Sequence, residues 1–162
     1  MSTFWKRFLI GSLIFVLASG GYIYFKFFIP ADIALNTIEV QGLNGKQIAL
    51  QDKIGKPMVV NFWATWCGPC LKEFPDFEKV KQQYGDKVNF VMISDEPLEK
   101  IKKFAKSKPY TFTFLKTNKT LNEYGITFIP TSYFYDTNGN LIAKDSNGFN
   151  VDSLTAMIEK LH

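Results

Sequence analysis

The chain of 162 residues is long enough for one ordinary domain with an appendage, but not for two large domains. Its 46% hydrophobic and 21% charged residues exclude a disordered chain. Two cysteines exclude a four-cysteine zinc site, and one histidine, the C-terminal His162, argues against a histidine metal cluster and against Cys-His or Ser-His catalysis. The net charge is +4, but Arg7 is the single arginine, so nucleic-acid binding is not favoured.

The first 30 residues have the pattern of a membrane-spanning helix. Residues 8–25 contain no charged side chain, and as a helix they would span about 27 Å, close to the hydrocarbon core of a bilayer. Aromatic side chains lie near both ends of this stretch, as they do at membrane interfaces. Because Lys6 and Arg7 precede it, we expect the N-terminus in the cytoplasm and the rest of the chain on the extracytoplasmic face of the cell membrane.

A cleaved signal peptide is the alternative for this segment. Ala18-Ser19-Gly20 places small residues at a spacing typical of a cleavage site. The apolar stretch continues beyond Gly20, which favours an uncleaved anchor. Both interpretations export the remainder of the chain. We therefore divide the chain into a membrane anchor at 1–30, a linker at 31–36 and a domain at 37–162.

In the domain, the hydrophobic pattern predicts strands that alternate with helices. Strands are expected at 37–40, 47–50, 58–63, 88–93, 110–115, 131–135 and 141–144. Helices are expected at 68–84, 97–107, 120–124 and from Asn150 or Asp152 to about 161. Asn138-Gly139 predicts a hairpin between the last two strands. This order of elements indicates a mixed sheet flanked by helices.

Both cysteines belong to one motif, Cys67-Gly68-Pro69-Cys70, between an apolar strand and a helix. That context is typical of a redox-active dithiol. Free amides and the positive end of the helix dipole should lower the pKa of the Cys67 thiol from about 8.5 toward about 7. We therefore expect Cys67 to attack a substrate disulfide and Cys70, one turn further along, to resolve the mixed disulfide.

A plain structural disulfide and half of a zinc site are the alternatives for this motif. The closed loop is too short to gain much stability from its closure. The sequence has no further cysteine and no internal histidine to complete a zinc site. We expect no metal site and no cofactor other than the Cys67–Cys70 disulfide.

The segment Val60-Asn61-Phe62-Trp63-Ala64-Thr65-Trp66-Cys67-Gly68-Pro69-Cys70 resembles the thioredoxin superfamily. More narrowly, the chain resembles the membrane-anchored TlpA-like and ResA-like thiol–disulfide reductases, over about residues 36–162. The resemblance implies an α/β, thioredoxin-like mixed central sheet flanked by helices. It also implies an inserted helix–strand element at about 94–116, while Leu43-Asn44-Gly45 between the first two expected strands predicts an N-terminal β-hairpin.

The same resemblance implies a substrate-binding surface beside the cysteines. Within Gly125–Thr131, Pro130 is expected to be a cis-proline that presents the backbone of Ile129 to an extended substrate peptide. An ordinary trans-proline at the start of a strand is the alternative. The residues assigned to substrate binding are Trp66, Gly68, Pro69, Ile129 and Pro130.

Asn61 marks a departure from cytoplasmic thioredoxins, which have a buried aspartate at this position. Asparagine cannot accept the proton of the resolving cysteine. The TlpA-like and ResA-like group instead resembles this chain in having Glu73, three residues after Cys70 and on a neighbouring part of the helix surface. A partly buried Glu73 would have a raised pKa and could shuttle a proton to or from Cys70. A solvent-exposed helix glutamate is the alternative.

Three functions are compatible with the fold and the motif. The first is a reductase of exported protein disulfides, and the resemblance implies apocytochrome c as a substrate and a transmembrane thiol carrier as the electron donor. The second is a disulfide oxidase or isomerase, but Gly68-Pro69 matches reducing thioredoxins near about −270 mV rather than oxidants near about −120 mV. The third is a non-catalytic binding module or copper chaperone, and the spacing of the cysteines and the lack of an internal histidine disfavour copper. A peroxidase would need a lone peroxidatic cysteine.

Overall fold

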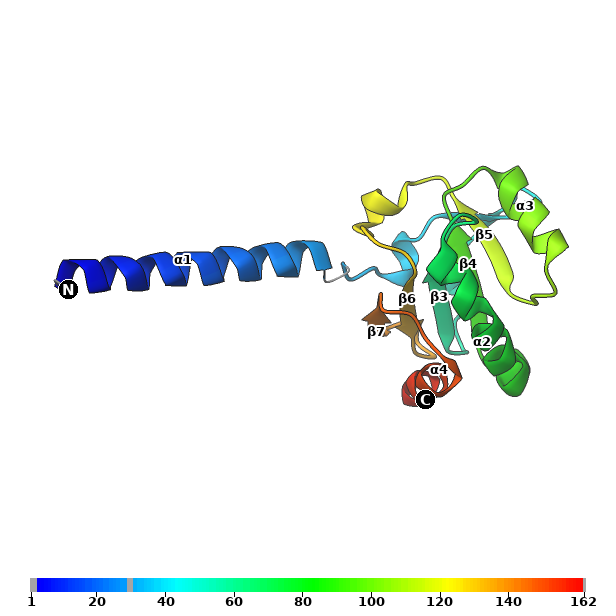
Figure 1. Ribbon diagram of the computed structural model, residues 1–162. Helices are drawn as coiled ribbons and strands as arrows, with labels where there is room; N and C mark the ends of the chain where they lie inside the picture. The colour runs from blue at the N-terminus through cyan, green and yellow to red at the C-terminus, as the bar shows by residue number, and fades with distance from the viewer. Residues whose placement is uncertain (1–2, 29–30, 162) are drawn as a thin grey trace.

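One seven-stranded sheet, in the order β2-β1-β5-β4-β3-β6-β7, forms the centre of the domain (Figure 1). The computed structural model describes residues 3–28 and 31–161, so the ends of the predicted anchor and His162 lie outside the described residues. The elements are α1 (Thr3–Phe28), β1 (Val40–Gly42), β2 (Gln47–Ile48), β3 (Met58–Phe62), α2 (Gly68–Tyr84), β4 (Asn89–Ser94), α3 (Leu98–Ser107), β5 (Thr113–Thr117), β6 (Thr131–Tyr135), β7 (Leu141–Asp145) and α4 (Val151–Ile158).

The three central strands β5, β4 and β3 are parallel, and the strands on either side of them are antiparallel. Helices α2 and α3 connect the parallel strands. Because both crossovers move in the same direction along the sheet and such crossovers are right-handed, both helices lie on the same face. The expected thioredoxin-like mixed sheet, with its N-terminal hairpin and its inserted helix and strand, is thus present.

The two faces of the sheet carry separate hydrophobic clusters. On the helical face, Val59 of β3 packs with Phe77 of α2, Ile101 of α3 and Leu154 of α4. The opposite face has no long helix among the described residues and is covered by turns and by the segment before β1. Since β3 is buried on both faces, it appears in the sequence as a continuous apolar run rather than an alternating one.

Aromatic rings dominate the helical face near the cysteine motif. The Trp63 ring centroid lies 5.1 Å from that of Phe74, 4.7 Å from that of Phe104 and 5.5 Å from that of Phe114. Trp63 is fully buried, and its contacts join β3 to α2, α3 and β5. The strand that leads into the motif is therefore held in a rigid environment.

The N-terminal helix α1 is not buried by the domain over its described apolar stretch. Trp5–Tyr24 is long and apolar enough to cross a membrane, and none of it is buried. A core helix of a soluble domain would be buried. The exposure of this stretch therefore favours a membrane span or a signal sequence. In Figure 1, α1 extends away from the domain.

The segment 31–36, expected as a linker, packs against the domain. Ile33 and Leu35 are buried in the cluster on the open face of the sheet. The hydroxyl groups of Tyr133 and Tyr135 donate to backbone carbonyls of this segment at 3.0 and 2.9 Å. This segment, expected as a linker, thus contributes two apolar side chains to the core of the domain.

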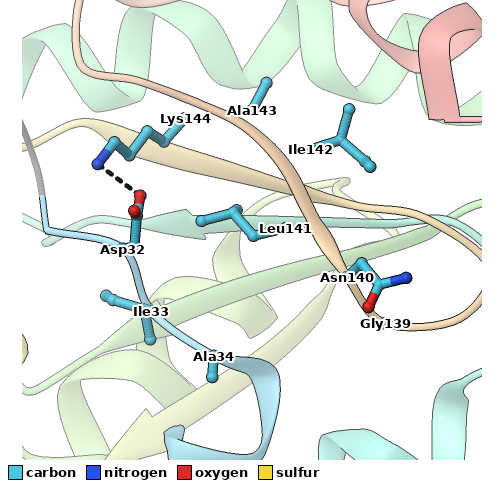
Figure 2. Close-up of a pocket in the computed structure, with 9 residues that line it drawn as sticks. All are labelled: Asp32, Ile33, Ala34, Gly139, Asn140, Leu141, Ile142, Ala143 and Lys144. Atoms are coloured by element: carbon cyan, nitrogen blue, oxygen red, sulfur yellow. Dashed lines mark hydrogen bonds and ion pairs between the residues drawn. The ribbon is translucent and has the colours of Figure 1, made fainter.

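A pocket of about 570 Å³ lies between this segment and the edge strand β7 (Figure 2). It is lined by 32–34 and 139–144, and an ion pair of 2.7 Å between Asp32 and Lys144 crosses it. None of the residues assigned to the redox site lines it. The pair ties the start of the domain to β7.

Most predicted elements are found within a few residues of their expected bounds, and α2 has the bounds expected for it. The first strand begins at Val40 rather than residue 37, because Leu35–Thr37 form a 3-10 turn. Pro97 is the N-cap residue of α3, with φ −52° and ψ 134°, instead of occupying its first turn. The helix expected at 120–124 is a 3-10 turn at Leu121–Tyr124, closed by Gly125 with φ +72°.

The fifth strand shows how pairing sets the bounds of an element. The sequence pattern predicts an aromatic strand at 110–115, but β5 starts at Thr113 because its register is set by pairing of Thr113–Lys116 with Val91–Ser94 of β4. Thr111 instead donates its backbone N–H and its hydroxyl to Glu78 of α2, both at 2.8 Å. The preceding residues therefore belong to a connection held by a helix rather than to the sheet.

Candidate active site

Cys67 and Cys70 form a disulfide at the N-terminus of α2, with their Cα atoms 5.3 Å apart. Cys67 is the N-cap residue, and its Sγ accepts a hydrogen bond of 3.2 Å from the backbone N–H of Cys70. The exposed fraction is 3% for Cys67 and 0% for Cys70. A partner's sulfur can therefore approach Cys67, whereas Cys70 is accessible only from within the protein.

A buried carboxylate holds the loop that leads to Cys67. Glu96 accepts hydrogen bonds from the backbone N–H of Thr65 at 2.6 Å and from the Thr65 hydroxyl at 2.8 Å. Glu96 follows β4, the parallel neighbour of β3, so the carboxyl ends of the two strands place it beside the loop. The sequence analysis gave Glu96 no role in the site, and an acid two residues after an apolar strand was the available signal.

Replacing Glu96 with alanine should lower the free energy of unfolding by about 1–3 kcal/mol, because the Thr65 N–H loses its partner in a part-buried site. Urea unfolding of the full-length chain in detergent measures this change. The control is Glu99→Ala in the first turn of α3, since Glu99 pairs with Lys102 at the surface and should contribute less than about 0.5 kcal/mol. Equal effects of the two variants would contradict the anchoring role of Glu96.

The peptide bond between Ile129 and Pro130 is cis, as expected. Pro130 is buried directly before β6, and the first residue of β6, Thr131, pairs with Phe62 at the end of β3. This register brings the Ile129–Pro130 backbone to the end of the sheet from which the cysteine motif begins. The motif and the cis-proline, about 60 residues apart in the sequence, thus lie at one edge of the domain.

Two pockets flank Ile129 at this edge. One, of about 200 Å³, is lined by Trp66 together with Phe128, and these two side chains are 73% and 52% exposed. The other, of about 490 Å³, is lined by Pro69, Pro130 and residues 146–150 of the connection between β7 and α4. Of the five residues assigned to substrate binding, four line one or both pockets, and the fifth, Gly68, is exposed at the start of α2. Phe128 was not singled out from the sequence.

Glu73 lines the second pocket and is only 5% exposed. Its Oε1 accepts a hydrogen bond of 2.7 Å from Asn61 Nδ2, and its Oε2 accepts one of 3.2 Å from the backbone N–H of Phe149. Burial raises the pKa of Glu73 to about 7, the two hydrogen bonds oppose this rise, and the charge of Asp145 adds to it. The interpretation of Glu73 as an exposed helix glutamate is wrong. At neutral pH this carboxyl can both take up and release a proton.

No group of three or more histidine, cysteine, aspartate or glutamate side chains suited to a metal ion occurs among residues 3–28 and 31–161. The reactive groups that the structure shows at this edge of the sheet are the Cys67–Cys70 disulfide and the buried carboxyl of Glu73. These groups suit a two-electron exchange of thiols and disulfides coupled to proton transfer.

Comparison with known proteins identifies the family. Residues 31–144 match the AhpC/TSA family. The chain belongs to this family. It is 32% identical over 126 residues to the thiol–disulfide oxidoreductase ResA of Bacillus cereus, a match that covers 75% of this chain and 73% of ResA. It is 39% identical over 102 residues to the thioredoxin-like protein YneN of Bacillus subtilis. This match covers 60% of this chain and 60% of YneN.

Solved structures agree with this assignment. DsbF of MTB, whose structure was determined in mixed oxidised and reduced forms, matches with a TM-score of 0.67 and 26% identity. The match covers 82% of this chain and all of DsbF. Together with the disulfide between Cys67 and Cys70, these relatives make the chain a thiol–disulfide oxidoreductase of the ResA and DsbE type. The resemblance inferred from the motif is confirmed.

Proposed function

We propose that this oxidoreductase reduces disulfides of exported proteins on the extracytoplasmic face of the cell membrane, where α1 anchors it. The apolar stretch of α1 and the basic pair Lys6-Arg7 before it support the anchor and its orientation. The relationship to ResA supports apocytochrome c as a substrate and a transmembrane thiol carrier as the electron donor. The observation that carries the proposal is the Cys67–Cys70 pair at the start of α2, with the buried carboxyl of Glu73 three residues after Cys70 on the same helix.

In the reducing direction, the Cys67 thiolate attacks one sulfur of the substrate disulfide. A bond forms between Cys67 Sγ and that sulfur, the substrate disulfide breaks, and the first substrate thiolate leaves. Cys70 then gives its proton to the carboxylate of Glu73, and the Cys70 thiolate attacks Cys67 Sγ. This closes the Cys67–Cys70 disulfide and releases the second thiolate, so two electrons pass from the protein to the substrate.

The backbone around the two pockets positions the substrate for this attack. Ile129 and the exposed Trp66 line one of these pockets, and Ile129 and Pro130 line the other together with Pro69 of the cysteine motif. An extended peptide bound there would present its sulfur to Cys67 rather than to the buried Cys70. A membrane-bound thiol carrier would then reduce the Cys67–Cys70 disulfide through the same opening.

Oxidation or isomerisation of disulfides is the second candidate, and the reduction potential separates it from the first. We expect the Cys67–Cys70 disulfide to have a reduction potential of about −250 mV or below, in the range of reducing proteins of this kind. Equilibration of the full-length chain in detergent with glutathione or dithiothreitol buffers measures this potential. Fluorescence of Trp63 and Trp66 follows the redox state. A potential of about −120 to −180 mV would instead assign the chain to oxidases or isomerases.

Replacing Glu73 with glutamine should remove a pH dependence centred near 7 from the step in which Cys70 resolves the mixed disulfide. The pKa of Glu73 is about 7, so above pH 7 the carboxylate accepts the Cys70 proton, and below pH 7 it is already protonated and cannot. At pH 8 the variant should be slower by about 100-fold, the usual size of general-base catalysis, whereas near pH 5.5 the two proteins should differ little. Single-turnover reduction of a disulfide peptide from pH 5 to 9 measures this step.

The matched control is Glu99→Gln, which removes a carboxylate from the surface. It should leave the pH profile unchanged. A Glu73→Gln protein with the profile of the original chain would refute the role of Glu73 as a base.

A further inference from the structure

Asn61 of β3 links Glu73 of α2 to Ser132 of β6 in the interior of the domain. Its Nδ2 donates hydrogen bonds of 2.7 Å to Glu73 Oε1 and 3.0 Å to Ser132 Oγ, its direct neighbour in the antiparallel pair. Its Oδ1 is buried and has no hydrogen-bond partner among the residues that the structure describes. Both amide hydrogens are thus in use while the amide oxygen is not, although buried polar atoms are normally paired.

The Asn61 amide, in this orientation, suits only the carboxylate form of Glu73. As a carboxylate, Glu73 accepts at both oxygens, from Asn61 and from the backbone of Phe149. As a carboxylic acid, it has an O–H that needs an acceptor, and the NH₂ group of Asn61 cannot provide one. A buried O–H without a partner would be costly. Because the pKa of Glu73 is about 7, both states occur near neutral pH.

We propose that Asn61 is the positioning residue that keeps Glu73 hydrogen-bonded in both protonation states, by turning its side-chain amide through half a turn when Glu73 gains a proton. The turn exchanges Nδ2 and Oδ1, which are nearly the same size, so the packing is kept. Oδ1 then accepts from the O–H of Glu73. The hydroxyl of Ser132 changes from acceptor to donor, as a rotating hydroxyl can. One proton is gained at Glu73, and no covalent bond other than this O–H forms or breaks.

The charged surroundings of Glu73 explain why an uncharged side chain at position 61 suits this task. Asp145 at the end of β7 already raises the pKa of Glu73, and Lys72 of α2 lines the same pocket. An aspartate in place of Asn61 would put a second carboxylate in contact with Glu73, and the two would then titrate as a coupled pair. Asparagine offers a donor and an acceptor without adding charge.

Side-chain amide spectra of the full-length chain in detergent test the proposal. The oxidised protein is labelled with ¹⁵N-asparagine and titrated from pH 5 to 9. We expect both Asn61 amide protons to move upfield together as the pH falls, with a midpoint near 7, because the turned NH₂ group leaves both of its acceptors. The Glu73→Gln variant should show no such titration. If only the proton facing Glu73 moves while the proton facing Ser132 stays in place, or if neither moves, the amide does not turn and the proposal is wrong.

A variant gives an independent measurement of the positioning role. Asn61→Leu should raise the midpoint of the Glu73 carboxyl titration, followed by ¹³C shift, by about one pH unit. The carboxylate loses a charge-assisted hydrogen bond about twice as strong as the neutral one lost by the acid. The control is Thr155→Val on α4, which removes another buried oxygen that lacks a partner among the described residues. It should leave the midpoint unchanged, and an unchanged midpoint in Asn61→Leu would overturn the role of Asn61.

This inference rests on the proposed function only for its consequence, the supply of an ordered proton acceptor to Cys70. The titrations need neither substrate nor electron donor. A chain that fails to reduce disulfides but shows the paired movement of the Asn61 protons would refute the proposed function and leave the inference intact. A chain that reduces disulfides but shows no paired movement of the Asn61 protons would refute the inference and leave the proposed function intact.

Discussion

Replacing Cys70 with serine should convert the protein from a catalyst into a trap. Cys67 would still attack a substrate disulfide, but no thiolate would follow to release the product, because a serine hydroxyl does not ionise near neutral pH. Steady-state turnover should fall by about 10³-fold or more, and the chain should accumulate in a mixed disulfide through Cys67. Non-reducing gels and mass spectrometry of the full-length chain detect this adduct.

The matched control is Cys67→Ser, which keeps the buried Cys70. It should lose turnover to the same degree without forming the adduct, since Cys70 is fully buried while Cys67 retains some exposure. Trapping by the Cys67→Ser variant, with none by Cys70→Ser, would reverse the assigned roles. The trapped partner would also identify the protein substrate.

Replacing Trp63 with alanine should lower the free energy of unfolding by about 3–5 kcal/mol, a large part of the about 5–15 kcal/mol that holds a typical domain. Trp63 is fully buried and contacts Phe74, Phe104 and Phe114, so its removal leaves a cavity between β3 and three other elements. Its Nε1 has no hydrogen-bond partner among the described residues, so no hydrogen bond is lost with the ring. Urea unfolding followed by circular dichroism measures the change.

Trp66, three residues further along, provides the control. It is 73% exposed, so Trp66→Ala should change stability by no more than about 0.5 kcal/mol. If both variants unfolded at the same urea concentration, the aromatic cluster would not be the main source of stability near the motif.

Local sequence patterns were sufficient for the elements that carry the cysteines. The apolar run at 58–63 predicted a strand, and the hydrophobic pattern of the following residues predicted the helix 68–84. The Cys67–Cys70 spacing predicted the redox motif at the helix start. These features depend on side chains within one or two turns of each other, so the order of residues determines them with little help from the rest of the chain.

Contacts between distant segments decided the rest of the site. The sequence left Glu73 either exposed or buried, and its burial and raised pKa depend on the packing around Asn61, 12 residues earlier, and Phe149, 76 residues later. The hydrogen bond from Thr65 to Glu96 likewise forms because the parallel strands β3 and β4 end side by side.

By itself, the sequence determined the thiol–disulfide chemistry, because that chemistry resides in a four-residue motif. The tertiary structure alone decided which groups surround Cys70 and Glu73. Desolvation and hydrogen bonding, which set a pKa, depend on neighbours in space rather than in sequence.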